Sequence, residues 1–240
     1  MKNRFNTLLK NSSNIFTIQR FVLSVFFAMV TGFSSQVVAA PTSTLIPFWD
    51  THDEKSNKSI DHSGWQTILD KYVDSHHKSG VNRVDYAKIV KEGKPQLKAY
   101  ISTMISLNPA EYSRAEQKAY WINLYNALTV DLIVKNYPVD TITDLGESFF
   151  KFGPWDDSIA EIQGKKLTLN NIEHGIIRPI YQDNRIHYAV NCASFGCPNL
   201  SPIAFTADNT DEQLNKAGRD YVNHSRGVMF DGDQLIVSSI

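Results

Sequence analysis

The clearest pattern of apolar and polar positions lies between residues 113 and 138 and predicts a long helix. Ser113 and Glu116 have the spacing of a capping box, in which each side chain satisfies a backbone N–H near the other residue. Apolar residues follow at helical spacing on both sides, at Trp121, Ile122, Leu124, Tyr125, Leu128, Val130, Leu132 and Ile133. We therefore expect a helix that is buried nearly all round and that ends before Pro138.

Three other stretches predict helices. One begins near Ser63, and its apolar face consists of Trp65, Ile68, Leu69 and Tyr72. A second covers Leu97–Leu107, with an apolar face made of Tyr100, Ile101, Met104 and Ile105. A third begins at Asn170, which we interpret as its N-cap because Glu173 follows three residues later.

Shorter segments predict strands and turns. Lys78-Ser79-Gly80 ends the first helix, and Val81–Tyr86 follows as a short extended piece. Residues 160–169 predict a hairpin that turns at Gln163-Gly164. Residues 185–190 alternate in the manner of a short strand.

A last hairpin turns at Asp231-Gly232, between the apolar runs Val228-Met229-Phe230 and Leu235-Ile236-Val237. Separate helices and hairpins predict the α+β class. We expect a helix-rich single domain with a small, mostly antiparallel sheet.

The first 39 residues have the order of a secretory signal peptide, which is positive, then apolar, then small. The apolar run Phe21–Phe33 has 13 residues, whereas a bilayer span needs about 20. We place cleavage after Ala39, with Pro41 two residues beyond it, and an uncleaved anchor is the alternative. Residues 40–62 are polar and mixed and predict a flexible lead-in to a domain at 63–240. The protein is therefore expected to be exported, into a periplasm or the medium.

The net charge of the chain limits the classes of partner that we expect it to bind. The leader holds four of the 24 Lys and Arg and none of the 25 Asp and Glu, so the remainder has 20 positive residues against 25 negative ones. Binding to nucleic acid is disfavoured, because it requires a basic face. No later apolar stretch predicts a stable membrane span once the leader is removed. An unidentified small-molecule or peptide substrate is the partner we expect.

The polar residues that suggest chemistry crowd into one region. They are Glu173, His174, Arg178, Arg185, His187, Asn191, Cys192 and Cys197. Asn123 and Asn126 lie three apart on the predicted buried helix, so their amides must bond a backbone, another side chain or a ligand. Each residue also has a structural interpretation: Glu173 as a helix cap, each histidine as a hydrogen-bonded residue, and Arg178 and Arg185 as partners in ion pairs.

Cys192 and Cys197 are the only cysteines and allow three interpretations. They could form a disulfide, because exported compartments are oxidising. Cys192 could instead be a free nucleophile, with His187 or His174 as the base. A zinc site is the third interpretation, although the Cys-x4-Cys spacing is at the wide end for zinc ligands; no other cofactor or metal is expected.

Two functions follow from these alternatives. The first is a cysteine-dependent hydrolase or acyl transferase that uses Cys192. In it, Glu173 or Asn191 orients the base, and Asn123 or Asn126 helps to stabilise an oxyanion. The second is a binding or structural protein in which the same residues form a polar core and a disulfide pins the loop.

Three motifs in series resemble those of the uncharacterised family called domain of unknown function 547: AYWINLYNALTV, LTLNNIEHGIIRP and RIHYAVNCASFGCPNL. The resemblance runs from about Trp65 to the end of the chain and implies that the polar residues above form one constellation. It also suggests a distant likeness to papain- or transglutaminase-like hydrolases, which is an analogy of fold only. Related sequences usually continue beyond the last hairpin with an aromatic-rich segment, so the resemblance implies that this chain is a fragment or a truncated copy.

Overall fold

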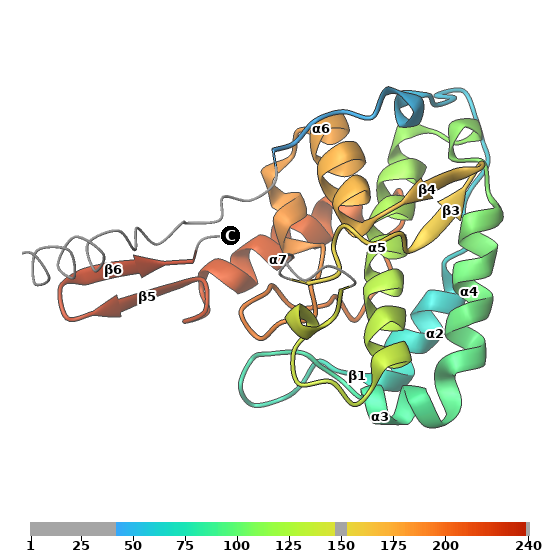
Figure 1. The fold of residues 1–240 in the computed structure, drawn as a ribbon. Coiled ribbons are helices and arrows are strands. Elements are labelled where there is room, and N and C mark those ends of the chain that lie inside the picture. Colours follow the sequence, from blue (N-terminus) through green and yellow to red (C-terminus); the bar gives the residue numbers. More distant parts are fainter. Residues whose placement is uncertain (1–41, 147–152, 239–240) are drawn as a thin grey trace, which may run out of the picture. The chain divides into compact units, whose positions relative to one another are not determined.

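Helix α5, Arg114–Asn136, lies at the centre of the computed structural model, which describes residues 42–146 and 153–238 (Figure 1). Every residue from 119 to 131 in α5 is buried, as the apolar positions on both sides of the helix predicted. The Ser113 hydroxyl accepts a hydrogen bond from the Glu116 N–H, so one of the two bonds of the predicted capping box is present. The Glu116 carboxylate accepts from the Ile60 N–H at 2.9 Å and thereby ties the preceding segment to the helix.

Two predicted helices pack beside α5. Helix α2, Ser63–Tyr72, contacts α4, Lys94–Ser106, and α4 contacts α5 (Figure 1). The Trp65 ring of α2 stacks on Tyr100 of α4, with their centroids 5.9 Å apart. Shorter helical segments lie near these helices in the sequence. They are α3 at Tyr86–Lys88, a π-helix at Ile89–Gly93, and 3-10 helices at Pro109–Glu111 and Ile142–Asp144.

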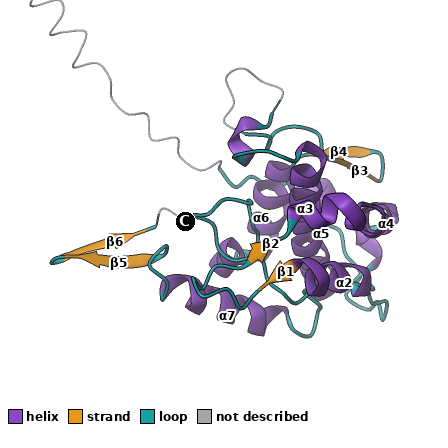
Figure 2. Ribbon diagram, turned by 90° about the horizontal axis from the view of Figure 1, so that it is seen from below, coloured by secondary structure: helices purple, strands orange, loops and turns teal. Residues whose placement is uncertain are grey.

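The described strands form three separate antiparallel pairs instead of one sheet. The pairs are β1 Val73–Asp74 with β2 Arg83–Val84, β3 Ala160–Ile162 with β4 Lys165–Leu167, and β5 Val228–Asp231 with β6 Gln234–Val237. The turn between β3 and β4 is at Gln163-Gly164, as predicted, and both residues have positive φ. The last turn is at Gly232-Asp233, one residue later than predicted. In Figure 2 the β5–β6 hairpin projects away from the helices.

The prediction of a strand at residues 185–190 is wrong. This segment contains a 3-10 helix, Asn184–Tyr188, and the Asp183 side chain caps it by accepting from the Arg185 N–H. Ile186, Ala189 and Val190 are buried, and this spacing of three and four residues is that of a helical turn. A good capping residue before that pattern explains the helical turn in place of a strand.

The segment before residue 63 also differs from its prediction as a flexible lead-in. A 3-10 helix at Pro47–Asp50 buries Trp49, whose ring contacts Trp121 of α5 with centroids 5.3 Å apart. Ile60 is buried in the same core. The described residues before Ser63 therefore pack against the core through the apolar side chains of Trp49 and Ile60. The predicted signal peptide lies outside the described residues.

Helix α7, Thr210–Val222, was not predicted from the sequence. It buries Leu214 and Tyr221, seven residues apart, and packs against the 3-10 helix at residues 184–188. The β5–β6 hairpin follows it along the chain (Figures 1 and 2). Among the described residues, no helix has the length and apolarity that crossing a membrane requires.

Candidate functional site

A π-helix carries two of the candidate residues. It covers Asn171–Ile177 and continues into α6, Arg178–Tyr181. Its start differs from the prediction, because Asn170 makes no capping bond and donates instead to Asp156 Oδ1 at 2.8 Å. Thr168 and Asn171 bond each other's backbone N–H groups at 3.0 and 3.1 Å, so a different pair of polar side chains caps this end.

The fold brings Glu173, His174 and His187 together. Glu173 Oε1 lies 3.8 Å from His174 Nε2 and 4.0 Å from His187 Nδ1. The Tyr125 hydroxyl of α5 is hydrogen-bonded to the same carboxylate. Glu173 therefore faces two imidazoles and a phenol, in place of the capping role that its sequence position also allowed. We call Glu173, His174, His187, Tyr125 and Arg178 the acid–base cluster.

Burial and one cation set the protonation of this cluster. Burial raises the pKa of Glu173, and the Tyr125 hydrogen bond and the Arg178 charge oppose that rise. Burial also lowers the pKa of His174 to about 4, with further lowering by Arg178 and His187. The pKa of His187 is lowered by burial and by Arg178. Both imidazoles are consequently neutral at pH 7.

Arg178 makes the two histidines unequal. Its NH1 donates to His174 Nδ1 at 3.0 Å, and a guanidinium can only donate. His174 Nδ1 must therefore be the acceptor, so the ring proton is on Nε2, which faces Glu173. In His187 the nitrogen nearer Glu173 is Nδ1, and Nε2 has no hydrogen bond to any described residue. His187 Nε2 is thus the one ring nitrogen of the pair that remains available to a reactant.

Asn123 and Asn126 bond to backbone groups of the loops that cross α5. Asn123 donates to Phe205 O at 2.7 Å and accepts from Phe205 N at 3.0 Å. Asn126 donates to Ala189 O at 2.9 Å and accepts from Asn191 N at 2.9 Å. Both amides are buried and paired, so in this structure they hold loops and are not aimed at a reacting group.

Arg185 lies in a separate ion-pair group. Its guanidinium donates to both Asp183 carboxylate oxygens at 2.9 and 2.8 Å, and to Asp211 and Asn215 of α7 at 2.7 Å each. Hydrogen bonds from Arg185 and Lys118 hold the pKa of Asp183 far below its usual range. Arg185 therefore joins the 3-10 helix to α7, which is the structural role its residue type allowed.

Cys192 and Cys197 form a disulfide, with their Cα atoms 6.2 Å apart. The bridged loop is held from outside, because Tyr221 OH donates to Gly196 O at 2.7 Å and Arg226 NH1 donates to Cys197 O at 2.8 Å. Phe195 at its tip is 74% exposed. The described residues contain no free cysteine and no group of three or more His, Cys, Asp and Glu side chains suited to a metal ion.

Consecutive residues of α5 connect the acid–base cluster with the disulfide loop. Tyr125 bonds Glu173, while Asn126 holds the backbone at Ala189 and Asn191, immediately before Cys192. The side chain of Asn191 then donates to Pro198 O at 2.7 Å, across the mouth of the bridged loop. One buried helix thereby fixes both groups.

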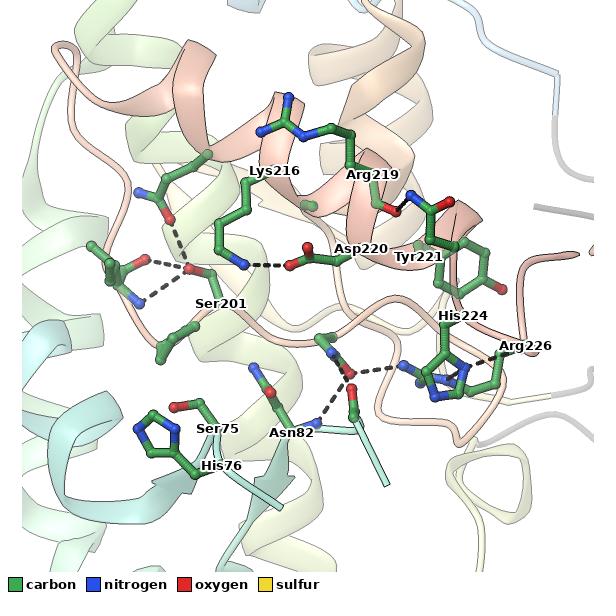
Figure 3. Close-up of a pocket in the computed structure, with 17 residues that line it drawn as sticks. Ser75, His76, Asn82, Ser201, Lys216, Arg219, Asp220, Tyr221, His224 and Arg226 are labelled. Atoms are coloured by element: carbon green, nitrogen blue, oxygen red, sulfur yellow. Dashed lines mark hydrogen bonds and ion pairs between the residues drawn. The ribbon is translucent and has the colours of Figure 1, made fainter. Parts of the chain in front are cut away.

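A pocket of about 800 Å³ is a second candidate site, which the sequence analysis missed together with α7 (Figure 3). Side chains of α7, the segment around Asn82 and the segment around Ser201 line it. Several of them bond one another: Ser201 bonds Gln213 at 2.7 Å, and Lys216 pairs with Asp220. The adjacent cation and carboxylate suit a polar ligand with both charges. The spacing of Leu214 and Tyr221 was the available signal for this helix.

Comparison with known proteins gives one family match. Residues 109–222 match the family described as "Protein of unknown function, DUF547". No curated protein and no solved structure matches the chain. The matched stretch contains α5, the acid–base cluster and the disulfide loop. Over this stretch the chain is similar to the DUF547 family of proteins of unknown function.

Proposed function

We propose that this protein is an exported thiol-dependent enzyme, a hydrolase or acyl transferase, whose Cys192–Cys197 bridge must be reduced before it acts. Cys192 is then the nucleophile, His187 its base and Glu173 the group that orients the base. The observation that carries the proposal is the geometry of His187, whose Nδ1 faces Glu173 Oε1 at 4.0 Å while Nε2 is unbonded among the described residues. A base oriented by a third group is the usual arrangement in nucleophilic catalysis.

The electrostatics of the cluster support a histidine base. The pKa of His187 is lowered by burial and by Arg178, so the ring is neutral at pH 7 and can accept a proton. His174 is less suited, because Arg178 occupies its Nδ1 and its Nε2 faces Glu173.

The chemical steps balance with a dithiol reductant as co-reactant. Two electrons from the dithiol convert the bridge to two thiols, and the dithiol becomes a disulfide. The Cys192 thiol gives its proton to His187 Nε2, and the sulfur attacks the carbonyl carbon of an ester or amide. The leaving group departs with that proton and leaves an acyl-thioester on Cys192. Water or another acceptor then takes the acyl group, which distinguishes a hydrolase from an acyl transferase.

Export is part of the proposal. Its supports are the order of residues in the first 39 positions and the presence of a disulfide, which persists mainly in oxidising compartments. The substrate is a small molecule or a peptide, and nucleic acid is disfavoured by the acidic balance of the chain after the leader.

A non-catalytic binding or structural role is the second candidate, and the disulfide itself favours it. Tyr221 and Arg226 hold the bridged loop through its carbonyls, so the loop has a structural explanation without turnover. Under this alternative Glu173, His174 and Arg178 are a hydrogen-bonded polar core.

Two matched variants distinguish these functions. Cys197→Ser and Cys192→Ser both remove the bridge, but only the first leaves the Cys192 thiol. We expect Cys197→Ser to hydrolyse activated acyl esters without reductant and Cys192→Ser to be inactive under all conditions. Wild-type protein should become active only after dithiothreitol is added. Equal rates for the two variants, at the level of the buffer, would leave the binding role as the explanation.

A further inference from the structure

We propose that the extended segment Ser43–Ile46, the strap, is a positioning element that holds the π-helix in the register in which Glu173 faces both histidines. Three hydrogen bonds join the strap to the helix. Thr44 N donates to His174 O at 3.0 Å, Ile46 N to Gly175 O at 2.8 Å, and Ser43 Oγ to His174 O at 3.3 Å. The effect of the strap on the helix register does not depend on the proposed function. Only the catalytic role of the acid–base cluster rests on that function.

Pro179 explains why the π-helix needs these donors. Arg178 N donates to Glu173 O, five residues back, which is the π register. The next bond in this register would join residue 179 to His174 O, and proline has no N–H to donate. A buried carbonyl without a partner is costly, so an outside donor is required. The Thr44 N–H supplies it.

Gly175 provides the space that lets the strap approach. A Cβ at this position would lie 2.5 Å from Ile46 Cδ1, well inside van der Waals contact. The Ile46 side chain, which is partly buried, packs against the core at this point. The backbone and the Ile46 side chain of the strap therefore both fit the π-helix closely.

The consequence for the cluster follows from helix geometry. His174 is itself the residue whose carbonyl the strap holds, and Glu173 is its neighbour. Consecutive side chains point in different relative directions in the π and α registers. Without the strap, a return to the α register would turn Glu173 away from at least one of the two imidazoles.

A proline scan of the strap tests this in the full-length, disulfide-bridged protein. Thr44→Pro removes the N–H that bonds His174 O, and Leu45→Pro is its matched control, because the Leu45 N–H bonds no described residue and its side chain is exposed. The readout is the pKa of His174 by NMR titration, which is about 4 in the intact cluster. Burial and the Arg178 cation lower the His174 pKa, and a change of register would weaken both effects. We therefore expect Thr44→Pro to raise this pKa toward the ordinary 6.5 and Leu45→Pro to leave it unchanged.

Gly175→Ala is the second variant, because it disturbs the strap from the helix side. Its collision is with the tip of the Ile46 side chain, so we expect the protein to fold and the His174 pKa to rise as in Thr44→Pro. Gly64→Ala is the control, since a Cβ there makes only an ordinary contact with Tyr100 at 3.5 Å. A His174 pKa that stays near 4 in folded Gly175→Ala would overturn the proposal. The bridged protein is used throughout, so this result does not depend on whether Cys192 is a nucleophile.

Discussion

Among single residues, Asn123 and Asn126 have the same chemistry but hold different loops. Each is a buried amide that donates to one backbone carbonyl and accepts from one backbone N–H. Only Asn126 holds the segment that leads into Cys192. A comparison of variants at the two residues therefore distinguishes the general cost of losing a buried amide from a specific effect on the disulfide loop.

Replacing Asn126 by Ala should leave Ala189 O and Asn191 N without partners. We expect the free energy of unfolding to fall by about 2 to 4 kcal/mol, because each buried unpaired group costs about 1 to 3 kcal/mol. Asn123→Ala should cost about the same. Reduction of the bridge by dithiothreitol should become faster in Asn126→Ala alone, and equal reduction rates in the two variants would contradict this account.

His62 predicts a pH dependence of stability with a definite sign. Burial lowers its pKa to about 4, against an ordinary value of 6.5. Between these values the unfolded chain binds more protons than the folded chain, so the fold loses stability as the pH falls from 6.5 to 4. In His62→Gln, roughly 2 to 3 kcal/mol of this loss should disappear, as measured by urea unfolding across pH 4 to 7. Parallel curves for variant and wild type would show that His62 does not carry the effect.

The sequence indicated that Glu173, His174 and His187 belong to one polar group. It did not indicate which of the two histidines is the base. That choice depends on Arg178 NH1 reaching His174 Nδ1, which is a contact within a π-helix. The residues around His187 were also predicted as a strand, whereas they form a 3-10 helix. A cluster of polar residues can be recognised from residue types in the sequence. Which of its side chains contact one another depends on the register of the backbone, which the sequence pattern does not show.

Among the elements, α7 depends on a polar connection as well as on its apolar face. Arg185 joins it to the 3-10 helix at residues 184–188 by bonds to Asp211 and Asn215. Leu214 and Tyr221 are buried beneath it. The ion pairs and the packing thus hold α7 in place, and α7 forms one side of the pocket in Figure 3.

Arg185→Gln should weaken this connection. We expect a loss of about 1 to 2 kcal/mol in the free energy of unfolding, since the guanidinium is partly exposed and solvent screens part of its effect. Arg219→Gln is the matched control on the exposed side of α7, where the side chain pairs with no described residue, and it should change stability by less than about 0.5 kcal/mol. Urea unfolding measures both, and equal losses would contradict a specific role for Arg185.

Elements with strong local signals were predictable, and those that depend on tertiary contacts were not. The Ser113 cap of α5 and the turn at Gln163-Gly164 are local, and the structure contains both. The strap could not be predicted, because Thr44 and Ile46 bond a helix about 130 residues later in the chain. Helix α7 was missed because its polar residues outnumber the few that are buried.

For the molecule as a whole, the proposed activation requires that the fold survive loss of the bridge. The closed loop is short, so the chain-entropy argument gives it only about 2 kcal/mol of stabilisation. Tyr221 and Arg226 hold the loop independently of the sulfurs. We expect dithiothreitol to lower the free energy of unfolding by about 2 kcal/mol or less and to leave the circular dichroism spectrum unchanged. Unfolding on reduction would contradict a reductively activated enzyme.

The central claim is that His187 activates Cys192 once the bridge is open. The most direct test is the rate of alkylation of Cys192 by iodoacetamide in Cys197→Ser, measured from pH 5 to 9, with and without His187→Gln. The account predicts that the thiol titrates well below its ordinary pKa of about 8.5 when His187 is present, and near that value when His187 is replaced. A thiol that titrates near 8.5 in both proteins would contradict the account and would favour a disulfide-pinned binding protein.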